Sequence, residues 1–508
     1  MTTADAPTSR PGATSDGPAT GSAPTPAHHD AAHDAPTGLD PKRVNIVLAI
    51  LVVSAMAMIL NETILSVALP AIMSDFSVSA DIAQWLTTGF MLTMAIVIPV
   101  TGFMLQRFTT KAMFVVAVSL FAAGTLMAAL APAFAVLLAA RVVQACGTAL
   151  ILPLLMTVTL TCVAPDKRGT MMGLNSVVIS VAPALGPTLS GFILNALSWR
   201  WLFWVMLPIA LVCLAAGAAL IGNVSETRRV PFDVASVIIS ALAFGGLVYG
   251  LSTVGAIVDG TGRDSIIALV AGAVFLAAFV VRQRELEKSG RALLNLRPFA
   301  VRNFRVSVIV VVAAMAMMLG TVIVIPIYLQ TALGVSALTT GLLLLPGGII
   351  QGIASPFIGR AYDAVGPRPL VIPGAAIMAG AQWWLTTLSE TTPIGVVIAM
   401  HVTFCLGMAL VMTPLMTVAL ASLPLPLYGH GSAIMNTLQQ LAGAAGTAVL
   451  VASMTIGAAA AAGAGATPMA ATAAGASEAF IAGGIIGLIG LIFSPFVSKL
   501  DRVHVDLD

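Results

Sequence analysis

The residue best placed to do chemistry in this sequence is a carboxylate inside a long apolar run. Glu62 is the only one of the 21 acidic residues that lies well inside a predicted membrane span, and Asp233 is the nearest exception. A buried carboxylate is expensive to ionise and tends to take up a proton instead. Glu62 is therefore a candidate proton carrier, at which a proton and a cationic substrate would compete. The alternative role is a structural hydrogen bond or ion pair.

Arg141 is the basic counterpart, because no other Lys or Arg lies inside a predicted span. The first helix is expected to run outward and end at Pro70, and the fourth to run inward after Pro132; Glu62 stands eight residues before Pro70, and Arg141 stands nine residues after Pro132. At about 1.5 Å per helical residue, both lie roughly 12–14 Å below the outer membrane boundary. The two side chains would pair if their helices are neighbours. Such a pair is either structural or, as we favour, a means by which Arg141 tunes the affinity of Glu62 for its proton.

Composition places both residues in a membrane. Of the 508 residues, 58% are hydrophobic and 9% are charged, and the mean hydropathy is +1.01. A soluble domain has about 25% charged residues, so lipid must be the solvent for most of this chain, and no separate catalytic domain fits. The segment 1–40 is expected to be a disordered cytoplasmic tail. Its His28, His29 and His33 are either solvated or a weak metal site.

Fourteen apolar runs reach the roughly 20 residues that a membrane-crossing helix needs. They begin near residues 44, 82, 112, 134, 170, 199, 233, 264, 306, 337, 369, 393, 431 and 476. The Ala/Gly-rich stretch 457–475 is expected to be an outer loop. With the N-terminus inside, Arg200 and Arg263 fall in outer loops and every other Lys and Arg except Arg141 falls in a cytoplasmic segment. The positive-inside rule predicts this asymmetry, so both termini are expected in the cytoplasm.

A weak internal repeat predicts two halves. GFMLQRFTTK (102–111) and GRAYDAVGPR (359–368) each follow an even-numbered span, start with Gly and carry a base at the tenth position. Two six-helix bundles separated by an extra helix pair explain this spacing. The expected parts are the tail 1–40, an N-terminal bundle (41–222), an inserted helix pair (223–283), a cytoplasmic connector (284–305), a C-terminal bundle (306–498) and a cytoplasmic tail (499–508).

Six segments, taken in order, resemble motifs of the fourteen-helix drug:proton antiporters, the QacA/EmrB-type branch of the major facilitator superfamily. They are LNETILSVALP (60–70), GFMLQRFTTK (102–111), RVVQACG (141–147), APALGPTLSG (182–191), WRWLFWVMLP (199–208) and GHGSAIMNTLQQLAGAAGTA (429–448). The resemblance runs from about residue 44 to 498. It implies the all-α integral membrane fold of that superfamily, with helices 1 and 4 as neighbours.

Among these motifs, the residues LNET and FTTK are most similar to those of the lincomycin-efflux subgroup. The sequence also departs from the family pattern in three places. Gln106 stands where the loop motif usually carries an acid, Glu62 stands where Asp is common, and Met206 stands where Asn is frequent. The second copy of the loop motif retains its acid, Asp363.

Two groups of residues are candidates for conformational control. Pro183, Gly186, Pro187 and Gly191 lie in the segment similar to the antiporter motif, where Pro interrupts backbone hydrogen bonds and Gly admits a neighbouring helix. This helix would restrict leakage between the two faces of the membrane, or it would only make ordinary packing contacts with its neighbours. Charged residues at cytoplasmic helix ends would hold the inner gate, or would only reflect the positive-inside rule; they are Arg107, Lys111, Arg360, Asp363 and Arg368.

Other polar or aromatic residues inside spans would line a substrate pocket or hold helices together. They are Trp85, Asn175, Gln330, Gln351, Asn436, Gln439 and Gln440.

The predicted function is that of a monomeric, proton-coupled antiporter of the cell membrane. It would export amphipathic drugs or antibiotics from the cytoplasm or inner leaflet by alternating access. No Walker-type run, metal-ligand cluster or nucleophile elbow occurs, so we predict no enzyme activity, no cofactor, no resident metal and no nucleic-acid partner. An exporter of an endogenous lipid, metabolite or siderophore is the alternative, and a membrane-embedded enzyme or channel is a more remote one.

Overall fold

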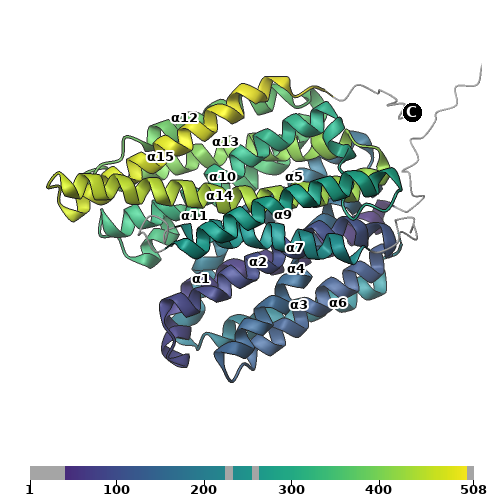
Figure 1. Ribbon diagram of the computed structural model, residues 1–508, viewed down its shortest axis with the longest axis horizontal. Helices are drawn as coiled ribbons and strands as arrows, with labels where there is room; N and C mark the ends of the chain where they lie inside the picture. The colour runs from purple at the N-terminus through teal and green to yellow at the C-terminus, as the bar shows by residue number, and fades with distance from the viewer. Residues whose placement is uncertain (1–40, 224–232, 255–261, 500–508) are drawn as a thin grey trace, which may run out of the picture. The chain divides into compact units, whose positions relative to one another are not determined.

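The computed structural model describes residues 41–223, 233–254 and 262–499, which belong to one compact unit. The tail histidines His28, His29 and His33 lie outside the described residues. Within these ranges the chain forms fourteen long α-helices (Figure 1). They are α1 (Pro41–Phe76), α2 (Ala80–Arg107), α3 (Thr110–Ala129), α4 (Phe134–Cys162), α5 (Arg168–Ala196), α6 (Arg200–Leu220), α7 (Val234–Ser252), α9 (Arg263–Lys288), α10 (Arg302–Thr331), α11 (Ala337–Val365), α12 (Arg368–Leu385), α13 (Ile394–Ala421), α14 (Tyr428–Gly463) and α15 (Pro468–Phe493).

Twelve of these helices are long and apolar enough to cross a membrane, judged over the described residues. The other two are α5 and α12, which are helical but do not meet the same criteria there. The prediction of an all-α membrane protein is therefore confirmed, and twelve of its fourteen spans are supported by length and hydropathy.

Local chemistry sets where the helices begin and end. The side chains of Thr109 and Ser336 accept hydrogen bonds of 3.2 Å from backbone N–H groups in the first turns of α3 and α11. Gly366, at φ +82°, ends α11 in a conformation that favours glycine, and Pro367 follows it. Thirteen of the fourteen predicted starts lie within about four residues of the observed ones, because such signals flank each apolar run.

Two local predictions were wrong. Pro70 does not end the first helix, because α1 continues through it to Phe76. The stretch 457–475 is mostly helical, since α14 extends to Gly463 and α15 begins at Pro468. Alanine has the highest helix propensity, which favours the extension of α14 through the run AAAAAG. A proline costs α1 one backbone hydrogen bond, which long membrane helices tolerate.

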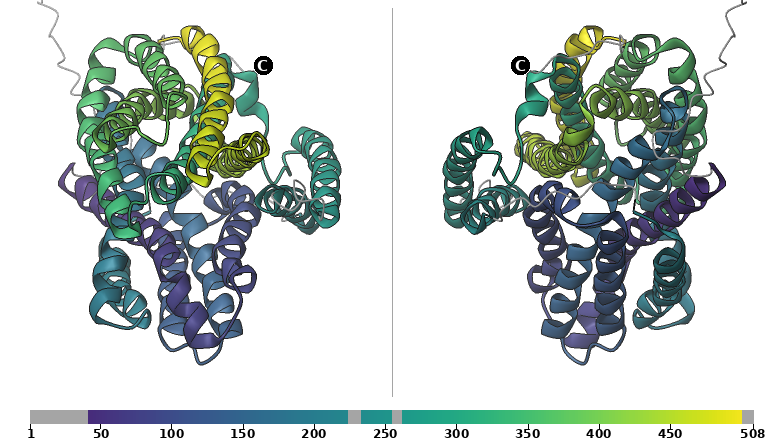
Figure 2. Two further views of the ribbon diagram at one scale, coloured as in Figure 1. Left: turned by 90° about the vertical axis from the view of Figure 1, so that its left-hand side faces the viewer. Right: turned by 90° about the vertical axis from the view of Figure 1, so that its right-hand side faces the viewer.

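The helices gather in two groups, seen end-on in Figure 2. Helices α1 to α6 pack together, and α10 to α15 pack together. Large apolar side chains fill the interior of each group, for example Phe114 and Phe121 in the first and Phe304 and Phe404 in the second. The groups meet mainly through α5 against α11 and through α2 against α14.

Close approaches between the two groups occur at the end where α2 meets α3, which we call the gate end. Gly169 of α5 packs against the backbone of Gly359 in α11. Gly102 of α2 similarly packs against His430 at the start of α14. Because glycine lacks a Cβ atom, the backbones approach more closely than other residues would allow.

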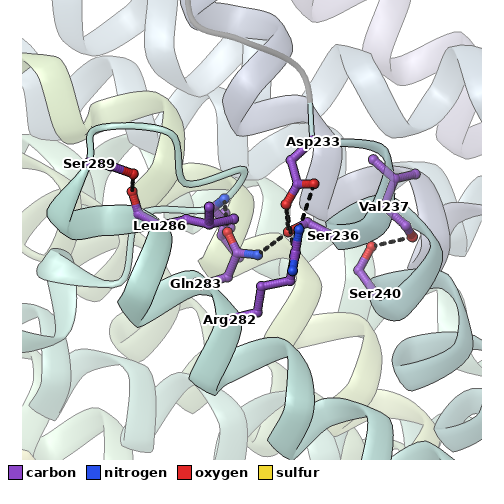
Figure 3. A network of polar contacts seen from close by, with 9 residues as sticks. Asp233, Ser236, Val237, Ser240, Arg282, Gln283, Leu286 and Ser289 are labelled. Atoms are coloured by element: carbon purple, nitrogen blue, oxygen red, sulfur yellow. Dashed lines mark hydrogen bonds and ion pairs between the residues drawn. The ribbon is translucent and has the colours of Figure 1, made fainter.

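Helices α7 and α9 pack on each other and lie beside α2 and α14 (Figure 2). A polar network fixes this pair (Figure 3): both carboxylate oxygens of Asp233 accept hydrogen bonds from Arg282, at 2.9 and 3.0 Å. These bonds hold the pKa of the Asp233 carboxyl below its usual range. The buried Gln283 donates to Ser236 at 2.7 Å and accepts from the N–H of Leu294 at 3.1 Å. The network thus ties the helix pair to the segment that leads to α10.

A second ion pair joins helices at the opposite end. Asp75 of α1 accepts hydrogen bonds from Arg200 at 2.8 Å and from the Trp199 indole at 3.1 Å. Arg200 also donates to the carbonyl of Ala131 at 3.1 Å. These donors hold the pKa of the Asp75 carboxyl below its usual range. The ion pair between Asp75 and Arg200 therefore weakens only as the pH falls through that lowered pKa.

Candidate functional site

Arg141 is completely buried in α4, where it contacts α1 and α2 directly and α3 through Gln144. Its Nε donates to the carbonyl of Leu86 at 3.3 Å, and its Nη1 donates to Gln144 Oε1 at 3.0 Å. Gln144 in turn donates to Thr125 Oγ1 at 2.9 Å. The guanidinium carbon lies 4.1 Å from the centre of the Phe90 ring, a cation–π distance. Such partners allow a positive charge to persist inside the bundle.

Glu62 lies half-buried on α1, next to this guanidinium. Arg141 Nη1 lies 3.5 Å from the carbonyl of Asn61, the residue before Glu62, and the two side-chain charges interact electrostatically. Among the described ion pairs within 4.0 Å, however, none joins Glu62 to Arg141. The structure therefore brings the two predicted residues together without locking them in direct contact. Arg141 Nη2 has no described hydrogen-bond partner, so one donor remains free to meet the carboxylate.

Helix α5 packs directly on α1 one residue beyond Glu62. A Cβ atom at Gly186 would collide with the side chain of Thr63. The Thr63 hydroxyl donates to the carbonyl of Ala182 at 3.4 Å. Pro183, Pro187 and Gly191 belong to the same helix. The predicted close packing at Gly186 is thus present, and its partner is the neighbour of the candidate proton carrier.

At the gate end, a carboxylate of α11 binds the start of α5. Asp363 accepts hydrogen bonds of 2.8 Å from the N–H groups of both Gly169 and Thr170, and one of 2.7 Å from the Thr170 hydroxyl. A carboxylate at a helix N-terminus satisfies free N–H groups and interacts favourably with the helix dipole. This is a physical latch between the two groups of helices.

The remaining charged residues predicted for the gate lie at the gate end or in the first turns of α12 and the last turns of α11. Arg368 donates to the carbonyl of Val497 at 2.7 Å, and Arg360 lies over the Phe357 ring at 5.9 Å. Arg107 and Lys111 are exposed near the α2–α3 turn. Gln106 stands where an acid was expected, and its amide donates to the carbonyl of Pro426 at 3.2 Å. An uncharged amide therefore makes a contact across to the second group.

A cavity lies between the two groups of helices, on the interior side of the Asp363 contact. The empty space between its lining residues, counted together with open solvent, is about 460 Å³. Helices α4 and α5 line one side, and α10, α11 and α13 line the other. Seven methionines and the neutral polar residues Asn175, Ser176, Gln351, Ser355 and Thr413 form most of its wall. We call this cavity the methionine chamber.

The sequence from residue 51 to 447 matches the family model of the Major Facilitator Superfamily. The chain belongs to this superfamily. The uncharacterized MFS-type transporter YcnB of Bacillus subtilis is 40% identical, over 92% of this chain and 98% of that protein. The lincomycin resistance protein LmrB of Listeria monocytogenes is 42% identical, over 86% of this chain and 93% of that protein. The human organic anion transporter MFSD10 (TETRAN) shares the fold, with a TM-score of 0.63 at 14% identity, over 90% of this chain and 100% of that chain.

These comparisons confirm the resemblance drawn from the motifs, including that to the lincomycin-efflux subgroup. A major facilitator chain is a transporter and not an enzyme, and such transporters typically use no cofactor.

The polar residues predicted for a pocket have different positions in this major facilitator chain. Asn175 and Gln351 line the methionine chamber. Trp85 stacks on Tyr249, with ring centres 6.0 Å apart, and so joins α2 to α7. Gln330 is exposed near the end of α10.

Three amides of α14 donate toward methionine sulfurs. Asn436 reaches Met156 at 4.0 Å, Gln439 reaches Met416 at 3.4 Å and Gln440 reaches Met94 at 3.8 Å. Met156 and Met416 belong to the chamber wall, so Asn436 and Gln439 support that wall from α14.

Sequence reasoning missed the methionines themselves. Met408, Met412 and Met416 recur at helical spacing on α13, and all three line the chamber. This spacing was a readable signal. Methionine in an apolar run nevertheless resembles ordinary core filling, because a flexible thioether fits many gaps.

Proposed function

We propose that this chain is a proton-coupled antiporter that exports amphipathic drugs or antibiotics by alternating access. The observation that carries this proposal is the half-buried carboxylate of Glu62 beside the fully buried Arg141. An ionisable residue inside a membrane bundle is energetically costly, and residues of this kind commonly serve transport. The name of the LmrB relative, a lincomycin resistance protein, supports a drug or antibiotic as the substrate.

The experiment that tests this function measures substrate-induced proton release from purified protein. The compound panel should contain lincomycin, aromatic amphipaths, lipids, metabolites and siderophores. Release triggered by lincomycin or by amphipathic drugs supports the proposal. Release triggered only by a lipid, metabolite or siderophore would assign the protein to endogenous export, and no release with any compound would refute proton coupling.

We further propose fourteen spans in the cell membrane, with α1–α6 and α10–α15 as the moving bundles (41–222 and 306–498). Residues 223–283 form the inserted pair, and 284–305 form the cytoplasmic connector. In this arrangement the gate end faces the cytoplasm, and the latch at Asp363 closes that side.

A cysteine-labelling experiment tests this topology. Ser74 and Ser289 are both exposed, and each can become Cys with almost no change in size. A membrane-impermeant thiol reagent added to intact cells should label Ser74→Cys and miss Ser289→Cys, which should react only in opened cells. The wild-type chain, with its four native cysteines, is the background control. Labelling of Ser289→Cys in intact cells would contradict the fourteen-span arrangement.

The latch makes a separate prediction about alternating access. Asp363→Asn keeps the side-chain shape but places an NH₂ group against the N–H donors of α5. Hydrogen bonds to a charged group are worth about 1.5–3 kcal/mol, so the closed gate should lose roughly tenfold or more in population.

Cross-linking between the two groups of helices measures this loss. Thr413 of α13 donates to Ser176 of α5 at 3.1 Å, and cysteines at these two positions should form a disulfide readily. Asp363→Asn should slow that reaction about tenfold. Asp233→Asn is the matched control, because it removes a carboxylate from the α7–α9 pair and should leave the rate unchanged. Equal rates in all three proteins would show that Asp363 does not hold the gate.

A further inference from the structure

The helix pair α7 and α9 lies beside the seam at which α2 of the first group meets α14 of the second (Figure 2). Helix α7 packs against both of these helices. Far from the gate end, Tyr249 of α7 stacks on Trp85 of α2, with ring centres 6.0 Å apart. The pair therefore bridges the seam and has a specific aromatic contact with the first group.

The chain that leaves α9 turns back toward the two groups of helices. Gly290 has a φ of +67°, a conformation that favours glycine and reverses the chain just beyond a helix. Leu293 and Leu294 follow the turn and are buried in an apolar cluster with residues of both groups. We call residues 291–296 the strap.

Two hydrogen bonds attach the strap, one to the inserted pair and one to α14. The fully buried Gln283 of α9 accepts from the N–H of Leu294 at 3.1 Å, and it donates to Ser236 of α7 at 2.7 Å (Figure 3). The N–H of the next residue, Asn295, donates to Nδ1 of His430 at 3.3 Å. His430 lies in the first turn of α14, so consecutive backbone amides connect the inserted pair to the second group.

His430 is buried at the point where α14, α2 and the strap meet. Its Nδ1 would lie only 2.9 Å from a Cβ atom at Gly102 of α2, so the imidazole contacts the α2 backbone as well as the strap. A nitrogen that accepts a hydrogen bond carries no proton, so this imidazole is neutral, with its proton on Nε2. Ordinary core packing would not need such an acceptor, whereas here it satisfies a backbone N–H group of the strap.

We propose that the inserted helix pair and the strap hold the α2–α14 seam closed at the gate end, and that His430 is the positioning residue to which the strap binds. This proposal rests on the alternating access of the proposed function, in which the gate end opens. The inserted pair stays with α2 through α7, so separation of α2 from α14 breaks the bond between Asn295 and His430. That bond therefore favours the closed gate end, although it touches neither Glu62 nor the methionine chamber.

Substitutions of His430 test this attachment in the full chain, in lipid nanodiscs at constant pH and without substrate. The measured quantity is the rate at which cysteines at Thr413 and Ser176 form a disulfide. His430→Leu keeps a side chain of similar size and removes the acceptor, so the reaction should be roughly fivefold slower, as expected for the loss of one neutral hydrogen bond. His430→Asn places an amide oxygen near the position of Nδ1 and should restore the rate to within about twofold of the wild type.

His401→Leu is the matched control. His401 is also a buried histidine of the second group, but it lies on α13 beside Gly347 of α11. Its substitution should leave the rate unchanged. Asp233→Asn leaves both strap bonds in place and should leave the rate unchanged as well.

Gln283→Leu tests whether the inserted pair acts through the strap. It removes the other attachment, and the reaction should again be roughly fivefold slower. Because the two bonds lie in series, the double variant Gln283→Leu/His430→Leu should react no more slowly than either single variant. Independent effects would multiply to roughly 25-fold, and that result would overturn the proposal, because each residue would then act only on its own surroundings.

Two substitutions of Asn295 provide a second test that leaves His430 intact. Asn295→Pro removes the donor N–H and should slow the reaction as His430→Leu does, whereas Asn295→Ala keeps the N–H and should react like the wild type. Both variants lose the side-chain oxygen that accepts from the N–H of Arg297, so only the strap bond distinguishes them. Wild-type rates in Asn295→Pro or His430→Leu would overturn the role of the strap. If Asp363→Asn still slows the reaction in that case, alternating access stands and only the strap proposal is wrong.

Discussion

Glu62→Gln is expected to abolish export driven by a pH gradient. Glutamine matches the size of glutamate and keeps one carbonyl acceptor, but it neither binds nor releases a proton in this pH range. If Glu62 takes up the coupling proton from outside and releases it to the cytoplasm, the variant cannot carry a proton on its return to the inward-facing form. In proteoliposomes with an imposed pH gradient, transport of lincomycin or another confirmed substrate should fall to the level of empty vesicles.

Two milder substitutions at the same site should have intermediate effects on export. Glu62→Asp keeps the charge and withdraws it by one methylene, so partial activity is expected. Arg141→Lys keeps a positive charge but loses the planar donor set that reaches Leu86, Asn61 and Gln144. Because Arg141 interacts electrostatically with Glu62, Arg141→Lys should shift the pH dependence of transport while leaving some export.

Wild-type export by Glu62→Gln, with an unchanged dependence on the pH gradient, would place the carrier elsewhere. Asp233 was the nearest alternative in the sequence, and Asp233→Asn would be the next variant to test. The structure gives Asp233 a different role, since both of its carboxylate oxygens accept hydrogen bonds from Arg282 at the start of α7. A carboxylate held in this way stays ionised and ties two helices together.

The sequence was enough to predict most of the fold. Membrane-length apolar runs, flanked by Pro, Gly and basic residues, determine where the helices lie. The same pattern failed at α14, because the run AAAAAG looks like a flexible loop by composition but is a strong helix former. It also failed at Pro70, because a proline within a long helix need not end it.

The sequence indicated which residues to consider for the site, but it did not indicate which groups they contact. Counting from Pro70 and Pro132 predicted that Glu62 and Arg141 lie at one depth, but the reference point Pro70 was wrong, because α1 continues to Phe76. Counting could not show that Arg141 uses its donors on Leu86, Asn61 and Gln144, because such contacts depend on how side chains from several helices meet. The methionine chamber could not be predicted for the same reason, because its seven methionines form one wall only after four helices pack together.

The second large effect is expected from Gly186→Leu, which should abolish export while the protein still reaches the membrane. A Cβ atom at this position would collide with the Thr63 side chain and lie 3.2 Å from the backbone nitrogen of Ile64. Either α5 must move away from α1, or the side chain of Thr63 must turn. Overpacking of this kind costs about 1–3 kcal/mol, and it acts on a helix that also lines the methionine chamber.

Two matched variants separate this specific clash from a general effect of leucine. Gly380→Leu changes a glycine of α12 that has nothing within 4 Å of its Cβ position, and it should export like the wild type. Gly186→Ala places a single methyl group against Thr63 and should reduce export partly. Thr63→Ala removes the hydroxyl oxygen, which is the nearest atom in that clash, so the double variant Gly186→Ala/Thr63→Ala should recover part of the lost transport.

A proton-leak measurement then distinguishes a barrier from ordinary packing. If close contact between α1 and α5 prevents leakage, proteoliposomes with Gly186→Ala should dissipate a pH gradient without substrate, several times faster than those with Gly380→Leu. If the contact only holds the helices together, both variants should keep the gradient and Gly186→Ala should lose only stability. Wild-type export by Gly186→Leu would show that transport does not need this close contact, and the segment would then serve only ordinary helix packing.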